Sequence, residues 1–330
     1  MNRRNRQLRE EEEKLLLSPE ATLSAESRGR EATEAPDEYR THFERDRDRI
    51  LHSKAFRRLK HKTQVFINPE GDHFVTRLTH TLQVMQIGRS LAASLGLNEA
   101  LTEAICLGHD VGHSPFGHTG ELALSPYVPG EWLHAAQSVR VFRVLEPLNL
   151  TWEVLDGIRG HTWRIEPPPR TPEGRLCRFA DRIAYLTHDV DDAIRAGVLK
   201  RSDVPKGATE AFGEPGREWI STMIIAVVEE SLEQGRVSMD PKMLQAMHEL
   251  RAFMFERVYE RPEAEAQQRR AVAIIQGLVD HFLRKPEDIP ESYRHEGAPL
   301  VTQAIDYVSG MTDRYALRLY DRLFRPEGLD

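Results

Sequence analysis

Apolar residues recur every three or four positions along most of this chain, the spacing that gathers them on one face of an α-helix. Residues 47–59 and 76–97 follow this spacing, and Gly96 is placed to end the second helix. Asn98 is the cap expected before a helix that starts at Glu99. The same pattern marks six further segments: 132–148, 175–197, 217–235, 241–260, 266–286 and 315–326.

Strand signals are scarce, and two longer loops interrupt the helices. Residues 63–67 (TQVFI) alternate as a strand does, so they are the best candidate for one arm of a small β-hairpin. The segments 166–174 and 204–216 are rich in Pro and Gly and are predicted to be loops. The predicted fold class is therefore all-α, with at most one small hairpin.

The pattern also divides the chain into three predicted parts. Residues 1–38 form an N-terminal arm with a short helix that Pro19 stops. Residues 39–200 carry the recognisable motifs and form the core. Residues 201–330 form a helical C-terminal part packed on that core.

Composition narrows the class of protein. With 330 residues, 40% hydrophobic and 29% charged, the chain is long enough to bury a substantial core. No apolar run approaches the length of a membrane span, and the charged N-terminus lacks a secretory signal. The two cysteines, Cys106 and Cys177, form no disulfide framework and suit a reducing compartment. We therefore expect a cytoplasmic protein without a membrane partner.

Charge is unevenly distributed. The net charge of −7 argues against general nucleic-acid binding, yet residues 40–62 hold nine Lys or Arg against three Asp or Glu. Such a run is either a solvated helix face or a local site for an anion. Given the acidic remainder of the chain, a small polyphosphate is the better guess for such an anion.

Four side chains on three predicted helices suggest a metal site. His80 lies on one helix, the pair His109–Asp110 on the next, and Asp181 on a third. Each sits among apolar residues, where an unpaired charge is costly, and a metal where the helices cross would remove that cost. Two imidazoles and two carboxylates leave room for water or substrate, which suits Mn²⁺, Fe²⁺, Co²⁺, Ni²⁺ or Mg²⁺ better than structural Zn²⁺.

Further polar residues lie at helical spacing around this set. His113 follows His109 by one turn, and Arg77 precedes His80 by three residues on the same face. His118 and Glu121 are three apart, so they either form a hydrogen-bonded pair or merely cap a helix. A third helix carries a stripe spaced by four residues: Asp181, Tyr185 and Asp189.

These motifs resemble a known family. The pattern His80, His109–Asp110 and Asp181 is similar to the metal signature of the HD-domain phosphohydrolases. The segments LGHDVGHSPFGHTGE, FADRIAYLTHDVDDAI and MTDRYALRLYDRLF closely resemble the bacterial deoxyguanosinetriphosphate triphosphohydrolase-like proteins. The resemblance implies an HD-domain helical bundle with extra C-terminal helices. It also implies hydrolysis of deoxynucleoside triphosphates (dNTPs) to deoxynucleoside and inorganic triphosphate.

The same resemblance implies individual roles. His118 and Glu121 would form the catalytic dyad at the attacking water, with His113 close to the metal. His134 would contact the α-phosphate and protonate the leaving oxygen, although Ala135 replaces the Asn usual in the family. Substrate contacts are implied for five residues: Arg77 and Arg182 to phosphate, Tyr185 to the deoxyribose, and Asp189 with Gln64 to the 3′-hydroxyl. Spacing alone would leave Tyr185 a core residue.

The resemblance further implies a homo-oligomer, a tetramer or a hexamer, with an effector dNTP bound at a second site. Two alternatives remain open. One is another HD phosphohydrolase, either a nucleoside 5′-monophosphatase or a guanosine tetraphosphate hydrolase. The other is a nucleotide sensor or single-stranded DNA binder. All four predicted metal ligands are present, which disfavours a site that has lost its chemistry.

Overall fold

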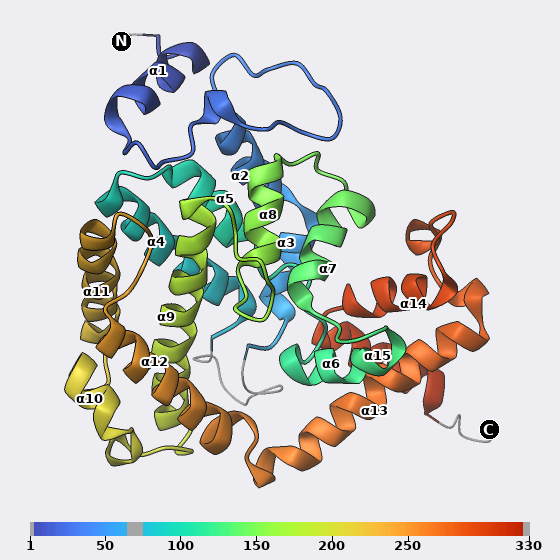
Figure 1. The fold of residues 1–330 in the computed structure, drawn as a ribbon. Coiled ribbons are helices and arrows are strands. Elements are labelled where there is room, and N and C mark those ends of the chain that lie inside the picture. The colour runs from blue at the N-terminus through green and yellow to red at the C-terminus, as the bar shows by residue number, and fades with distance from the viewer. Residues whose placement is uncertain (1–2, 65–74, 326–330) are drawn as a thin grey trace. The chain divides into compact units, whose positions relative to one another are not determined.

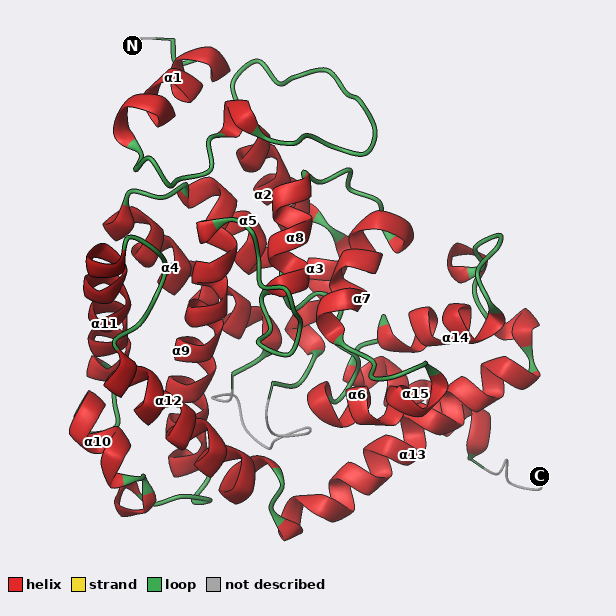
Figure 2. Cartoon of the chain, in the orientation of Figure 1, coloured by secondary structure: helices red, strands yellow, loops and turns green. Residues whose placement is uncertain are grey.

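The computed structural model describes residues 3–64 and 75–325. Every regular element in these two ranges is a helix, as Figure 2 shows. Within the same ranges, β pairing is limited to isolated bridges between Arg30 and Thr151 and between Thr63 and Thr76. The all-α prediction is confirmed.

The chain forms two compact units, each made of three segments that are separated in the sequence. The first consists of Met1–Ser53, Thr79–His109 and Leu148–Arg261. The second consists of Lys54–Leu78, Asp110–Pro147 and Pro262–Asp330. The expected division at residues 38 and 200 stays a prediction.

The first unit is built around α9 (Pro172–Arg195), which packs against α5, α8, α11 and α12 (Figure 1). Its 24 residues are long enough to present different side chains to each neighbour. The other helices of this unit are α1 (Arg6–Leu16), α2 (His42–His52), α4 (Arg77–Leu95, from Thr79 onwards), α5 (Glu99–Gly108), α8 (Trp152–Gly160), α10 (Lys206–Phe212), α11 (Glu218–Gln234) and α12 (Pro241–Met254).

The second unit is built around α13 (Pro262–Arg284), which packs against α6, α14 and α15. Apolar side chains of these helices, with Phe116 and Trp132, form one buried cluster. The other helices are α3 (Lys54–Arg58), α6 (Gly117–Leu124), α7 (His134–Arg140), α14 (Leu300–Ser309) and α15 (Asp313–Phe324).

Residues 47–59 do not form the single helix that their pattern predicted. Helix α2 ends at His52, Ser53 is extended, and α3 begins at Lys54. The backbone amides of Lys54 and Ala55 donate to the carboxylate of Glu146 at 2.7 and 2.9 Å, so this distant side chain caps α3. A break of this kind depends on a tertiary contact that hydrophobic spacing does not record.

Other local predictions were also wrong or incomplete. The segment 204–216 is not all loop, because it contains α10, which packs against α12 and buries Ala208 and Phe212. Helix α9 begins within the predicted loop 166–174, and α8 and α14 were not predicted. Of the strand predicted at 63–67, residues 65–67 lie outside the described residues.

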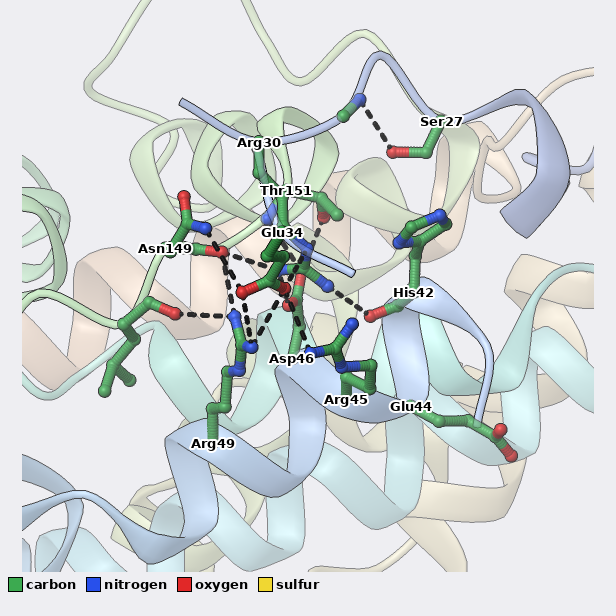
Figure 3. Close-up of polar contacts among 12 residues, drawn as sticks. Ser27, Arg30, Glu34, His42, Glu44, Arg45, Asp46, Arg49, Asn149 and Thr151 are labelled. Carbon is green, nitrogen blue, oxygen red and sulfur yellow. Dashed lines mark hydrogen bonds and ion pairs between the residues drawn. The ribbon is translucent and has the colours of Figure 1, made fainter. Parts of the chain in front are cut away.

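Residues of the predicted N-terminal arm are held against the rest of the first unit by buried polar contacts (Figure 3). The carboxylate of Asp46 is fully buried, pairs with Arg30, and accepts hydrogen bonds from the amide and hydroxyl of Thr151 at 2.8 and 2.7 Å. Glu34 pairs with Arg45 and Arg49, two members of the basic run. Removing one partner of a buried pair such as Arg30–Asp46 typically costs about 3–5 kcal/mol.

Within the described part of the chain, no helix combines the length and apolar character that a membrane crossing requires.

Candidate active site

Three helices of the first unit bring together two histidines and an aspartate. His80 lies on α4, His109 directly follows the last residue of α5, and Asp181 lies near the middle of α9. Nε2 of His80 lies 3.1 Å from Oδ1 of Asp181, and Nε2 of His109 lies 3.8 Å from the same oxygen. His80 and His109 are 2% and 0% exposed. These three predicted ligands therefore meet in a buried cluster.

His161 joins this cluster, although it was not among the predicted site residues. Its ring centroid lies 4.9 Å from that of His109, and the residue is buried. Ligand atoms of His109, His161 and Asp181 all lie within 4.8 Å of one another. A weak signal was available, because both histidines follow a glycine at a helix end, in LGHD and RGHT.

Hydrogen bonds determine which nitrogen of these rings faces Asp181. Nδ1 of His109 lies 2.6 Å from the carbonyl oxygen of Cys106, and Nδ1 of His161 lies 2.7 Å from that of Ile158. A carbonyl oxygen only accepts, so Nδ1 carries the hydrogen and Nε2 of the neutral ring keeps its lone pair. Histidines that bind metals are commonly oriented in this way.

The charge of Asp181 completes a donor set suited to a metal. Burial alone would raise the pKa of Asp181, but the hydrogen bond from His80 holds it below its usual range. The carboxylate is therefore ionised at neutral pH. Buried imidazole nitrogens beside an ionised carboxylate fit a first-row divalent cation, so this cluster can bind a metal.

Asp110 follows His109 directly in the chain and begins the polar cluster of the second unit. Nη1 of Arg77 donates to Oδ2 of Asp110 at 2.7 Å, and Nε2 atoms of His113 and His134 lie 3.4 and 3.8 Å from Oδ1. Asp110 is 3% exposed. Arg77 thus neutralises and orients a predicted metal ligand in this structure.

Glu121, on α6, is shared by three histidines. Nδ1 of His134 lies 2.5 Å from Oε1, and the backbone amide of His134 donates to the same oxygen at 3.1 Å. Nδ1 of His113 lies 3.6 Å from Oε1, whereas Nδ1 of His118 lies 3.4 Å from Oε2. The expected His118–Glu121 pair is present, but Glu121 is closer to His134.

The surroundings of His134 and His113 shift the pKa values of these two histidines in opposite directions. Burial would raise the pKa of Glu121, but the neighbouring charge of His134 holds it well below its usual range. Burial would lower the pKa of His134, but the charge of Glu121 raises it above its usual value. Burial lowers the pKa of His113 well below its usual value, and the charge of Arg77 adds to this. Glu121 thus favours the protonated form of His134, whereas burial favours the neutral form of His113, whose ring centroid lies 3.8 Å from that of His134.

One close contact and two left-handed residues shape the loop between His109 and His118. A Cβ atom at Gly112 would lie 2.2 Å from the backbone nitrogen of Ser138, so only glycine lets this turn reach α7. Phe116 and Gly117 then adopt φ values of 62° and 58°, which turn the chain into α6. The imidazole of His118 at the start of α6 is 64% exposed, whereas Glu121 is buried.

The stripe predicted on α9 lies in the first unit. The guanidinium of Arg182 stacks over the ring of Trp163 at 4.0 Å, and burial lowers the pKa of Arg182. Burial raises the pKa of the Tyr185 hydroxyl. The hydroxyl of Tyr259 donates to Oδ2 of Asp189 at 2.6 Å. Gln64 belongs to the second unit, so its expected pairing with Asp189 stays a prediction.

The sequence patterns did not identify three residues that contact this stripe: Trp163, Arg251 and Tyr259. Trp163 lies between α8 and α9, just before the predicted loop 166–174. Arg251 lies on α12, and its charge acts on Tyr185 and Arg182. Tyr259 ends a π-helical turn, Phe255–Tyr259, that follows α12. A tyrosine or tryptophan at such a position is indistinguishable from a core residue by spacing alone.

Known proteins match both the site-bearing segments and the fold. The chain matches the HD domain over residues 77–186 and the phosphohydrolase-associated domain over residues 237–322. A solved phosphohydrolase from Bacteroides thetaiotaomicron superposes with a TM-score of 0.52, covering 84% of this chain and 69% of that one at 18% identity. That likeness concerns the fold alone. The two family matches, in contrast, define the class of the protein as a hydrolase of the HD phosphohydrolases.

Curated relatives narrow this class. Proteins named deoxyguanosinetriphosphate triphosphohydrolase-like are 48% identical in Caldanaerobacter subterraneus, over 97% of this chain and 96% of the relative. Those of Desulfatibacillum aliphaticivorans and Clostridium perfringens strain 13 are 45% and 43% identical, each over 96% of this chain. These two matches cover 97% and 96% of the respective relatives. The chain belongs to the family of deoxyguanosinetriphosphate triphosphohydrolase-like proteins, which confirms the resemblance.

Proposed function

We propose that this protein hydrolyses dNTPs to a deoxynucleoside and inorganic triphosphate. The observation that carries this proposal is the pair His109–Asp110, which links two clusters of polar side chains along the chain. His109 belongs to the cluster with His80 and Asp181, and Asp110 to the cluster with Glu121 and three histidines. The relatives' names support the dNTP as substrate.

His80, His109, Asp110 and Asp181 would hold a divalent cation, with His161 beside them. When bound, the cation supplies Lewis-acid polarisation of a phosphoryl oxygen. Arg77 and Arg182 would bind phosphate oxygens, because a guanidinium matches their geometry and charge. Tyr185 would pack against the deoxyribose, and Asp189 with Gln64 would bind its 3′-hydroxyl.

The second cluster would move protons. Glu121 raises the pKa of His134, which favours a ring that can donate a proton to the sugar 5′-oxygen as that oxygen leaves. His118 is exposed and its Nδ1 faces Glu121, so it can accept a proton from the attacking water. Glu121 would orient both rings through its two oxygens.

Product analysis tests this proposal. Purified protein is incubated with each of the four dNTPs, singly and mixed, with Mn²⁺ or Mg²⁺, and the products are separated by ion exchange. We expect tripolyphosphate and deoxynucleoside in equal amounts, and a gain in the mixtures would indicate an effector dNTP. Orthophosphate or pyrophosphate would instead support another HD phosphohydrolase, and tight binding without turnover would support a sensor.

A further inference from the structure

Eight residues of the C-terminal region contact several segments that carry the second cluster. They run from Asp306, near the end of α14, to Asp313, the first residue of α15. All of these contacts lie inside the second unit. We call this stretch the 306–313 brace.

Asp313 holds two segments with one buried carboxylate. Its Oδ1 accepts the backbone N–H of Phe116 at 3.1 Å. Its Oδ2 accepts the backbone N–H of Thr63 at 3.0 Å and also the Thr63 hydroxyl. The residue is 6% exposed, so water competes weakly for these donors.

The Phe116 contact bears directly on the proposed proton chemistry. Phe116 has a left-handed backbone with φ 62°, a conformation that a side chain makes unfavourable unless neighbouring contacts support it. Helix α6 starts at the next residue and carries His118 and Glu121 in its first turns. A carboxylate that fixes the Phe116 amide therefore fixes the start of the helix that presents both side chains.

Asp306 holds helix α7 through hydrogen bonds to two of its side chains. Its carboxylate is fully buried and accepts Nε of Arg140 at 2.7 Å, Nη2 of Arg140 at 2.6 Å and Nε2 of Gln137 at 3.0 Å. Helix α7 begins at His134. Between the two aspartates, the carbonyl oxygen of Ser309 accepts a hydrogen bond from Nζ of Lys62 at 3.0 Å. The same Nζ also donates a hydrogen bond to the carbonyl oxygen of His113.

We propose that Asp313 is a positioning residue of the active site, which sets the place of His118 and Glu121 by holding the Phe116 turn, and that Asp306 does the same for His134. This inference rests on the proposed function for its kinetic consequence, but its structural part does not. Both aspartates lie within residues 237–322, so the proposal also gives a structural role to the segment that matches the phosphohydrolase-associated domain. Neither aspartate has to touch the substrate.

Matched variants of the full-length, metal-loaded protein test the proposal. Asp313→Asn keeps the size of the side chain but leaves one acceptor oxygen for donors that two oxygens now serve. Asp306→Asn is its counterpart at α7, and Asp321→Asn, on the exposed face of α15, is the control. Each is measured for kcat, KM, bound metal, melting temperature and amide hydrogen exchange.

We expect Asp313→Asn to lower kcat by about 10- to 100-fold, the scale of a small misplacement of reacting groups. KM and metal content should change by less than about twofold, because the metal ligands are untouched. Exchange should accelerate at residues 116–121 and stay slow at residues 134–140. Asp306→Asn should show the reverse pattern of exchange, and Asp321→Asn should match the wild type in all measurements.

Unchanged exchange at residues 116–121 in Asp313→Asn would overturn the proposal. So would an unchanged kcat, or a loss of kcat explained by the unfolded fraction at the assay temperature. If Asp313→Asn fails to fold, Thr63→Val removes a single donor to the same carboxylate and should give the same exchange pattern, more weakly. If the wild type hydrolyses no dNTP, the proposed function fails, while the exchange measurements still decide whether the brace positions α6.

Discussion

At Glu121, one buried carboxylate serves three imidazole rings, and its two oxygens divide them. Oε1 faces His134 and His113, whereas Oε2 faces His118. The proposed function assigns metal ligation to His109 and Asp110 and proton transfer to His118 and His134. Single substitutions should separate the two tasks.

Replacing His118 by alanine should lower kcat by about 10²- to 10⁴-fold, the usual contribution of a general acid or base. Metal content, measured by mass spectrometry on the purified protein, should stay near that of the wild type. Asp110→Ala should lose both turnover and metal. Equal metal loss in the two variants would contradict the division.

Tyr185 should discriminate against ribonucleotides. A ring packed under C2′ leaves no room for a 2′-hydroxyl, so Tyr185→Ala should raise the ratio of ribonucleotide to deoxynucleotide kcat/KM by about tenfold or more. The ratio is measured with matched pairs of nucleotides at one metal concentration. Ribonucleotide rejection as strong as in the wild type would refute this steric explanation.

At the scale of elements, α5 and α8 end in the same way. Each closes with a glycine, followed by a histidine whose Nδ1 donates to the carbonyl three residues earlier. Gly108 allows α5 to pack closely on α8, since a Cβ atom on it would lie 2.5 Å from Cδ1 of Ile158. The spacing of these helix ends therefore sets the distance between His109 and His161.

Gly108→Ala should therefore weaken the metal site without removing a ligand. Overpacking of this kind usually costs about 1–3 kcal/mol, and the two histidines would separate as the helices move apart. We expect a lower melting temperature and a weaker affinity for Mn²⁺ in titration calorimetry. Gly216→Ala is the control, because a Cβ atom there would meet only the carbonyl oxygen of Glu214, at an ordinary contact distance of 3.9 Å. Wild-type affinity in Gly108→Ala would show that the helix spacing is not limiting.

At the scale of the whole molecule, metal binding should stabilise the folded chain, because its ligands come from segments far apart in sequence. A ligand at 100 times its Kd that binds only the folded state adds about 2.7 kcal/mol to the free energy of unfolding. Mn²⁺ should therefore raise the melting temperature, and a chelator should reverse the rise. Asp181→Asn should abolish the shift, whereas Asp191→Asn on the same helix should keep it. A shift that persists in Asp181→Asn would place the metal elsewhere.

Sequence patterns predicted the helices that carry most of the site, because α4, α5 and α9 have long apolar faces and recognisable ends. They also singled out His80, His109 and Asp181, whose polarity is costly among apolar neighbours. They did not predict the break at Ser53 or the helix α10. The first depends on the distant Glu146 side chain, and the second is too short for its pattern to register.

The sequence by itself determined the fold class, the family and the residue types that chemistry requires, since these follow from local periodicity and from motifs of contiguous residues. Only the tertiary structure decided which partners those residues take. In the folded chain His161 lies beside His109, and Glu121 faces His134 as well as His118. The carboxylate of Asp313 accepts the backbone N–H of Phe116. Such pairings join residues far apart in the chain, and their energies depend on burial and distance, which no local pattern encodes.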